Sequence, residues 1–211
     1  MSGITSIDLG SAAMARKKSS SNKTSMRRGA QQLRIIGGDW RSRRIQFADA
    51  PGLRPTMDKV RETVFNWLQW DIEGKIILDG FAGSGALGYE ALSRGAKEVT
   101  FLEFNASAAN CIRESLQSLD ASNAIVHQTD AIAWLAQQSD LEQFDVIFLD
   151  PPFGRELLKP AVDIIAEKAK TGCLVYVEVE TKADLSCIPA NWLETKRKDG
   201  KEFNFMLFEV E

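Results

Sequence analysis

Ile76-Ile77-Leu78-Asp79-Gly80-Phe81-Ala82-Gly83-Ser84-Gly85 is the stretch that decides the fold of this 211-residue chain. Three apolar residues lead into an acid, a glycine-rich turn and a helical pattern. A strand, a glycine loop and a helix in this order form the opening unit of nucleotide-binding α/β folds. Gly83 and Gly85 let a ligand approach the backbone, and the loop amides can donate hydrogen bonds to it.

Downstream of this unit, apolar strands alternate with helices, which predicts a doubly wound, mostly parallel α/β sheet with right-handed crossovers. The end of the chain differs, because Asp199-Gly200 separates two alternating runs and predicts an antiparallel hairpin, giving seven strands in all. The predicted strands are Lys75–Asp79, Val99–Glu103, Ala124–Gln128, Phe144–Leu149, Leu174–Glu178, Trp192–Arg197 and Phe203–Val210, and the predicted helices are Gly85–Arg94, Ala106–Leu119, Ala131–Gln138 and Glu156–Lys170.

The sequence upstream of the sheet divides into two parts. Residues 1–30 are rich in Ser, Lys, Arg and Gly without periodicity, which predicts a disordered basic tail. Residues 31–70 predict a small unit of its own, with a hairpin over Arg34–Phe47 turned by Gly37-Gly38, a turn at Ala50–Gly52 and a helix over Thr56–Trp70. Residues 71–211 form the predicted α/β domain.

The charge of the chain is unevenly distributed. Residues 1–44 carry ten Lys and Arg against two Asp, a net charge of +8, whereas the remainder carries −11. A basic arm on an acidic body indicates a polyanionic partner reached by the arm, although a solvated disordered tail explains residues 1–30 equally well.

Composition excludes several classes of protein. No apolar run approaches the ~20 residues that span a bilayer, and we expect no secretory signal. The three cysteines are far apart, which is typical of reduced thiols, so we expect a cytoplasmic protein. A metal site is not expected, because the chain has one histidine, His127, which we expect to be structural.

Acidic residues follow three successive predicted strands. Asp79 precedes the glycine loop, Glu103 ends the next strand, and Asp130 follows the third. A carboxylate at Glu103 can accept both hydroxyls of a ribose, and one at Asp130 can meet an adenine amine. Because ligands of such sheets bind at the carboxyl ends of the strands, the pattern predicts a nucleoside-containing cofactor there.

A nicotinamide-binding fold is the competing interpretation. Gly83-Ser84-Gly85-Ala86-Leu87-Gly88 matches Gly-x-Gly-x-x-Gly, with Glu103 at a plausible spacing for a ribose. In that fingerprint, however, a pyrophosphate binds at the helix N-terminus, and Asp79 would repel it. An acid at this point suits a cationic sulfonium ligand better. The acids also weaken a third interpretation, that the glycines only make a tight turn.

Asp150-Pro151-Pro152-Phe153 ends the apolar run that begins at Phe144. Two prolines cannot extend a strand, so the backbone must turn stiffly there. Asp150 and the Pro151 carbonyl can each accept one N–H of an exocyclic base amine, while Phe153 stacks on the base. Methyl transfer to such an amine is the chemistry that this arrangement serves best, and the alternative is an Asp that only caps a helix.

Together these motifs resemble the class I S-adenosylmethionine-dependent methyltransferases, and the amino-methyltransferases among them. A closer resemblance lies upstream. Arg34-Ile35-Ile36-Gly37-Gly38 and the block from Leu53 to Leu68, which contains Arg-Pro-Thr, Arg-Glu and Phe-Asn-Trp-Leu, are similar to the bacterial small-subunit ribosomal RNA methyltransferase D family. That family methylates the 2-amino group of a guanine in 16S ribosomal RNA. The resemblance covers the chain from about Leu33 to its end.

The resemblance implies a Rossmann-like fold, S-adenosylmethionine as cofactor and 16S ribosomal RNA of the small subunit as partner. It also implies two sets of site residues. The cofactor is lined by Asp79, Phe81, Gly83, Gly85, Glu103, Asp130 and Ala131, and the guanine is held by Asp150, Pro151 and Phe153. Gly80 departs from the family, which usually has a bulky apolar residue there, and this difference predicts a looser loop.

The predicted RNA surface consists of basic residues of the N-terminal unit, namely Arg34, Arg41, Arg43, Arg44, Arg54, Lys59 and Arg61. For Lys59 and Arg61 a solvated helix face is the alternative, and Trp40 can either stack on a base or pack the hairpin. We expect a monomer without membrane contact. Two other functions stay open, an adenine-amine methyltransferase acting on DNA or RNA and a non-catalytic RNA-binding protein.

Overall fold

The computed structural model describes residues 31–47 and 58–211. The predicted tail, the turn at Ala50–Gly52, Arg54 and the predicted helix start at Thr56 lie outside these ranges. In chain order the elements are β1 (Gln31–Arg34), β2 (Arg44–Phe47), α1 (Asp58–Trp67), β3 (Ile76–Asp79), α2 (Ala86–Ser93), β4 (Glu98–Glu103), α3 (Ala106–Ser118), β5 (Ala124–Gln128), α4 (Ala131–Gln137), β6 (Val146–Leu149), α5 (Leu158–Lys168), β7 (Leu174–Glu180), β8 (Trp192–Asp199) and β9 (Phe203–Val210).

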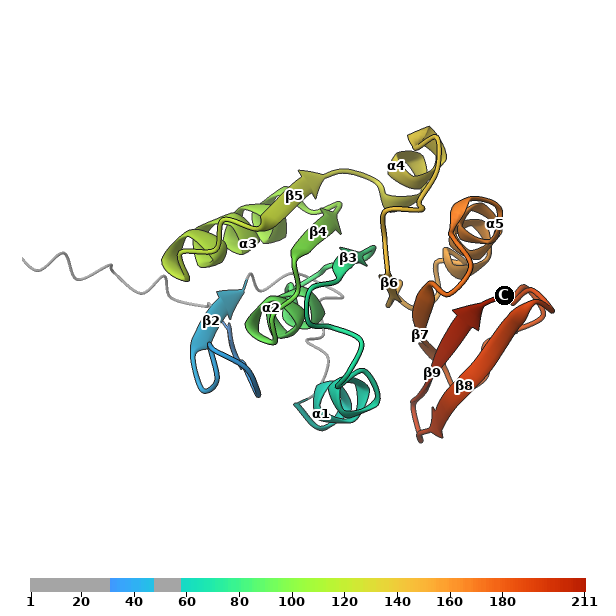
Figure 1. Ribbon diagram of the computed structural model, residues 1–211, viewed down its shortest axis with the longest axis horizontal. Coiled ribbons are helices and arrows are strands. Elements are labelled where there is room, and N and C mark those ends of the chain that lie inside the picture. The colour runs from blue at the N-terminus through green and yellow to red at the C-terminus, as the bar shows by residue number, and fades with distance from the viewer. Residues whose placement is uncertain (1–30, 48–57) are drawn as a thin grey trace, which may run out of the picture.

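Seven strands form one sheet in the order β5-β4-β3-β6-β7-β9-β8 (Figure 1). The five strands from β5 to β7 are parallel, and β9 pairs antiparallel with both β7 and β8. The mostly parallel doubly wound sheet and its C-terminal hairpin are therefore confirmed. The strand order runs outward in opposite directions from β3 and β6, so these two strands flank the topological switch point, where ligands of such sheets bind.

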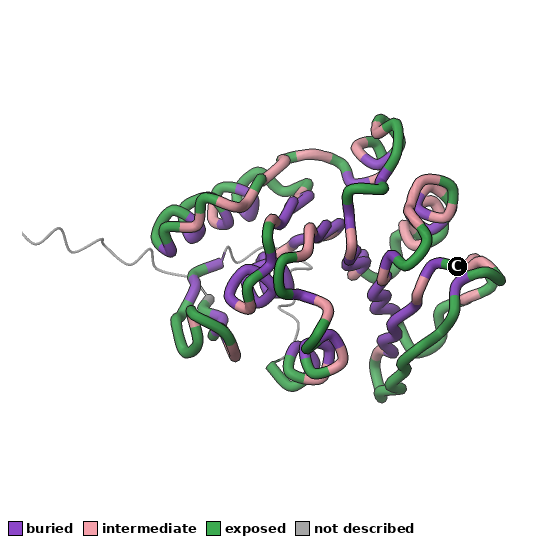
Figure 2. Tube along the Cα trace, in the orientation of Figure 1, coloured by how far each residue is buried: buried purple, intermediate pink, exposed green. Residues whose placement is uncertain are grey.

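The two faces of the sheet carry separate hydrophobic cores. Strand β6 is buried throughout and alternates between them, with Val146 and Phe148 facing one core and Ile147 and Leu149 the other. Helices α1, α2 and α3 cover the first face, and α4 and α5 the second (Figure 2). This explains why the central strands read as continuous apolar runs rather than as alternating ones.

The N-terminal hairpin packs on the first face. Strands β1 and β2 pair antiparallel with Arg34 opposite Arg44, which confirms a hairpin, but its connecting loop spans residues 35–43. The predicted turn at the glycine pair is present, since the Gly38 carbonyl accepts from the amide of Arg41 at 3.1 Å and Gly38 has a φ angle of 72°. Gly38 also lets the loop approach α2, because a Cβ at this position would lie 1.7 Å from the carbonyl oxygen of Ser93. The amide of Asp39 donates to that carbonyl at 2.7 Å.

None of the helices in the described residues is long and apolar enough to cross a membrane.

Candidate active site

Three acids lie at the carboxyl ends of three adjacent strands of the sheet, β4, β3 and β6. Strand β3 pairs with β4 and β6, and Asp79 is opposite Phe101 on one side and Phe148 on the other. Glu103 and Asp150 each follow those partners by two residues, so the sheet brings them to the same edge as Asp79. The strand register therefore brings these acids together at the switch point.

Asp79 is buried beneath the glycine loop, with 2% of its surface exposed. Its Oδ2 accepts a hydrogen bond of 3.1 Å from the amide of Gly88, in the first turn of α2. Burial raises the pKa of Asp79 to about 7, the Gly88 amide opposes this, and the negative charge of Glu103 adds to it. A carboxyl group held this way would gain from a cationic neighbour.

Glu103 connects the glycine loop to the end of β4. Its Oε2 accepts from the amide of Gly83 at 2.7 Å, and its Oε1 accepts from the amide of Asn105 at 2.6 Å. Burial raises the pKa of Glu103, and these two amides lower it in part. Gly83 and Gly85 both have positive φ angles, of 53° and 78°, which other residues adopt only at a cost.

Gly80, the residue that departs from the family pattern, is fixed between β3 and β6. Its amide donates to the carbonyl oxygen of Phe148 at 3.0 Å. A Cβ at this position would lie 3.1 Å from the same oxygen, so a larger residue would need that carbonyl to shift by a few tenths of an ångström. Glycine at this position therefore leaves room for the hydrogen bond between the Gly80 amide and the Phe148 carbonyl.

The other predicted cofactor residues lie around this edge. Phe81 is half-buried and packs against the second core. Asp130 is exposed and caps α4, since its Oδ1 accepts from the amide of Ala133 at 2.9 Å. Ala131, the first residue of α4, is buried. The cap uses one carboxylate oxygen of Asp130. Contact of Asp130 and Ala131 with a cofactor stays a prediction.

The Asp-Pro-Pro-Phe segment leaves β6 as a loop. Asp150 is half-buried, Pro151 is buried, and the ring of Phe153 is 40% exposed. The charge of Asp150 contributes to raising the pKa of the Tyr176 hydroxyl on β7, so the two groups share one electrostatic neighbourhood. Phe153 follows Asp150 by three residues, and its exposed ring is available to stack on a base.

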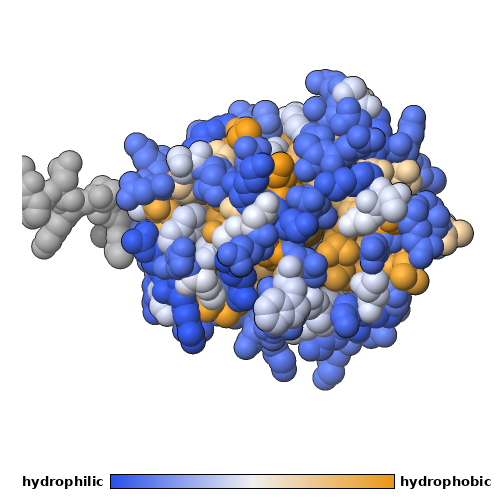
Figure 3. All heavy atoms as spheres, viewed as in Figure 1, coloured by the Kyte–Doolittle hydropathy of each residue, from blue (hydrophilic) through white to orange (hydrophobic). Residues whose placement is uncertain are grey.

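Sequence reasoning missed two residues at this edge. Glu178, near the end of β7, is 6% exposed and accepts a hydrogen bond from Tyr176, and Phe104, directly after Glu103, is 70% exposed. Both could have been found by the rule that identified Glu103, since each lies at the carboxyl end of a strand. Figure 3 shows that hydrophobic residues reach the surface in the middle of a mostly hydrophilic face.

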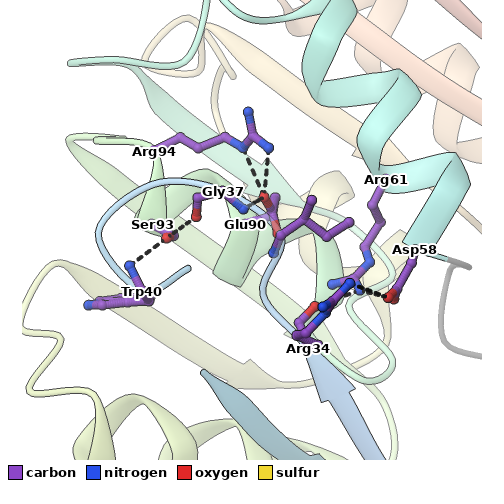
Figure 4. A network of polar contacts seen from close by, with 9 residues as sticks. Arg34, Gly37, Trp40, Asp58, Arg61, Glu90, Ser93 and Arg94 are labelled. Carbon is purple, nitrogen blue, oxygen red and sulfur yellow. Dashed lines mark hydrogen bonds and ion pairs between the residues drawn. The ribbon is translucent and has the colours of Figure 1, made fainter. Parts of the chain in front are cut away.

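The hairpin carries most of the predicted RNA-binding residues that the structure describes. Arg34, Arg41, Arg43 and Arg44 are exposed on it, and Lys59 is exposed on α1. Arg54 lies outside the described residues. Arg61 was wrongly placed on this surface, because its side chain is 1% exposed. Its Nη2 donates to Asp58 Oδ1 at 2.6 Å and to the Arg34 carbonyl at 2.8 Å, tying α1 to β1 (Figure 4).

A buried carboxylate on α2 fixes the hairpin in place. Glu90 is fully buried and accepts hydrogen bonds from the amides of Ile36 and Gly37, at 2.9 and 2.7 Å, and from Arg94 Nε at 2.9 Å (Figure 4). Ser93 accepts from the Trp40 amide at 2.9 Å, and the Trp40 ring packs against the first core. The hairpin is therefore held rigidly against the helix that follows the glycine loop.

Two further predictions concern residues away from this edge. His127 lies in β5 and its ring packs on Trp134, with centroids 5.5 Å apart. Within residues 31–47 and 58–211, no group of His, Cys, Asp and Glu is arranged to hold a metal ion.

Comparison with known proteins gives the family. Residues 33–209 match the family model described as "Conserved hypothetical protein 95". The chain is 41% identical to the ribosomal RNA small subunit methyltransferase D of Escherichia coli, over 87% of this chain and 92% of that protein. It is 43% identical to that of Haemophilus influenzae, over 84% and 94%.

Solved structures agree with these relatives. A structure from Escherichia coli named as a methyltransferase superposes with a TM-score of 0.77 at 40% identity, covering 86% of this chain and 99% of that one. An RNA methyltransferase from Salinibacter ruber in complex with S-adenosylhomocysteine has a TM-score of 0.57 at 15% identity, which shows a shared fold only. The edge of acids, the Asp-Pro-Pro-Phe loop and these similarities agree, and the chain belongs to the ribosomal RNA small subunit methyltransferase D family.

Proposed function

We propose that this protein transfers a methyl group from S-adenosylmethionine to the 2-amino group of a guanine in 16S ribosomal RNA. The observation that carries the proposal is the meeting of Asp79, Glu103 and Asp150 at one sheet edge, in a chain of this family. Its action on ribosomal RNA implies a cytoplasmic location, and we propose that it works as a monomer with residues 31–70 as its RNA-binding part.

The residues present fit the cofactor. S-adenosylmethionine, when bound, supplies an electrophilic methyl group on a cationic sulfonium. Asp79 and Glu103 are carboxylates whose burial disfavours their charge, so a cation between them would offset that cost. We assign the ribose to Glu103, the adenine surroundings to Asp130, Ala131 and the exposed ring of Phe104, and the remaining contacts to Phe81, Gly83 and Gly85.

Asp150 and Pro151 would hold the reacting amine. The lone pair of an exocyclic amine is delocalised into the base, which makes it a poor nucleophile. Acceptance of one N–H by Asp150 and the other by the Pro151 carbonyl would direct the lone pair out of the ring, and Phe153 would stack on the base. Positioning of this kind can supply ~7–11 kcal/mol of a barrier. Asp150 can also accept the released proton.

The target base must leave its helix or lie in a loop, because a paired base cannot enter this clamp. The test is methyl transfer from tritiated S-adenosylmethionine to ribosomal RNA or small subunits from cells that lack this gene. Nucleoside analysis should place the label in 2-methylguanosine. Label in methyladenosine, or no label on any RNA despite cofactor binding, would contradict the proposal.

A further inference from the structure

A second acid stands beside Asp150 at the sheet edge. Strands β6 and β7 are parallel neighbours with Leu149 opposite Val177, so one residue further the same register brings Glu178 beside Asp150. Asp150 and Glu178 also share a face of the sheet with Phe148 and Tyr176, by the alternation of a strand. That face is the one covered by α1 and the hairpin.

Glu178 is held by a rigid partner. The Tyr176 hydroxyl donates to Glu178 Oε2 at 2.7 Å, and both side chains are buried. The Tyr176 ring packs edge-on against Phe148, with centroids 6.1 Å apart, and Phe148 in turn contacts Phe65 of α1. The hydroxyl therefore has a fixed direction and sets the orientation of the carboxylate.

Among the described residues, no Lys or Arg forms an ion pair with Glu178. Burial raises the pKa of Glu178 and the Tyr176 hydroxyl partly lowers it, while the charges of Glu178 and Asp150 add to the effect of burial in raising the pKa of Tyr176. A buried acid such as Glu178 is costly for stability, which is typical of groups kept for binding or catalysis.

The chemistry of the bases shows what such a group can recognise. Guanine presents its 2-amino group beside an N1–H, two adjacent donors on the Watson–Crick edge. Adenine presents its 6-amino group beside an N1 lone pair, and cytosine presents its 4-amino group beside an N3 lone pair. If Asp150 accepts from the reacting amine, the neighbouring acceptor would bind N1–H of guanine and repel either lone pair.

We infer that Glu178 determines the base specificity of this enzyme: its carboxylate accepts the N1–H of the target guanine beside the amine that Asp150 holds. Tyr176 is a positioning residue that orients this carboxylate. The inference rests on the proposed function and deepens it, since Asp-Pro-Pro-Phe by itself serves guanine and adenine amines alike. The 2-amino group is then bound by Asp150, which follows β6, and the adjacent N1–H by Glu178 of β7.

The test compares two target bases in otherwise identical RNA. Once the methylated position is mapped with the wild type, that nucleotide is replaced by 2-aminopurine, which keeps the 2-amino group but has a lone pair at N1. We expect the wild type to prefer guanine by about 100-fold in kcat/KM, as for a lost base-edge contact. In Glu178→Gln the side-chain amide can donate to that lone pair, so the preference should fall below about tenfold.

Three comparisons separate the possible outcomes. Glu180→Gln changes an exposed acid on the same strand and should keep the wild-type ratio. Tyr176→Phe should lower the preference by a smaller factor, and cofactor affinity should be unchanged in all variants. An unchanged ratio in Glu178→Gln, or an equal loss on both bases, would overturn the inference. Failure of the wild type to methylate guanine at all would instead overturn the proposed function, and the inference with it.

Discussion

At the scale of single residues, the site is a place where carboxyl groups are kept from water. Burial raises the pKa values of Asp79, Glu103 and Glu178. The sequence could place Asp79 and Glu103 at strand ends, but it could not show how deeply they are buried, because burial depends on the loop and helix packed over them. Each group is costly for folding and useful for binding a cation or a base donor.

Replacement of Asp79 by Asn should stabilise the ligand-free protein above neutral pH. The folded pKa is about 7 and the ordinary value 3.8, so the unfolded chain loses the proton first as pH rises. The contribution of Asp79 to stability is therefore highest below about pH 4 and falls as pH rises to 7, by up to about 4 kcal/mol. Asp79→Asn removes this dependence and can still accept from the Gly88 amide.

Chemical denaturation at pH 4, 6 and 8 measures the effect, with the exposed Asp39→Asn as control. We expect the two proteins to be similar at pH 4, and the variant to be more stable at pH 8 yet weaker in binding S-adenosylmethionine. Equal stability of wild type and variant at pH 8 would show that burial of Asp79 does not carry this cost.

Asp150 and Glu103 should separate chemistry from cofactor binding. Asp150→Ala removes the acceptor for the amine, so turnover should fall by at least about 100-fold while cofactor affinity changes by a few-fold only. Glu103→Ala removes the ribose acceptor and the partner of the Gly83 amide, so cofactor binding should weaken. Isothermal titration measures the cofactor affinity of the two variants, and a methyl-transfer assay measures their turnover. If the two variants lose cofactor binding equally, the proposed division of roles is wrong.

At the scale of elements, the sequence located strands and helices well wherever one local signal dominated. Ala124–Gln128 and Phe203–Val210 were predicted with the bounds that the structure has, because apolar runs and turn residues delimit them. Arg61 was misread, and the close approach of Gly38 to α2 was missed, for a common reason. Each depends on a contact with a segment far along the chain, β1 for Arg61 and α2 for Gly38, and no local pattern reports such contacts.

The attachment of the hairpin to α2 should depend on Glu90. Glu90→Ala leaves Arg94 and two backbone amides without their acceptor, which should destabilise the protein by about 3–5 kcal/mol. Glu90→Gln keeps the shape and should cost less. Glu114→Ala, an exposed acid on α3, is the control.

Hydrogen exchange gives the local readout for Glu90. The amides of Ile36 and Gly37 should exchange faster in both Glu90 variants, while amides in β4 and β5 keep their protection in Glu90→Gln. If the Ile36 and Gly37 amides stay protected, the hairpin is held by its apolar contacts rather than by this carboxylate.

At the scale of the whole molecule, the structure shows on which face of the sheet part of the basic N-terminal segment lies. The basic hairpin packs on the sheet face that also carries Phe148 and Tyr176, so RNA bound to its exposed arginines would lie on the same side as the proposed base pocket. The sequence predicted the fold and the edge where the acids meet, because both follow from strand order. It could not predict Glu178 as a partner of Asp150, which requires the register between β6 and β7.

Removal of the hairpin charges should therefore weaken RNA binding through its salt-dependent part. In the triple variant Arg41→Gln, Arg43→Gln, Arg44→Gln, up to three phosphate contacts are lost, so log K should depend less steeply on log salt, by ~0.7 to 0.9 for each contact. Cofactor affinity should not change, since none of the three lies at the sheet edge. The matched control neutralises Lys196, Lys198 and Lys201, all exposed and at the other end of the sheet. A slope that falls equally in the two triple variants would mean that RNA responds to overall charge. A fall confined to the hairpin variant would instead place the phosphates beside β1 and β2, on the sheet face that carries Phe148 and Tyr176.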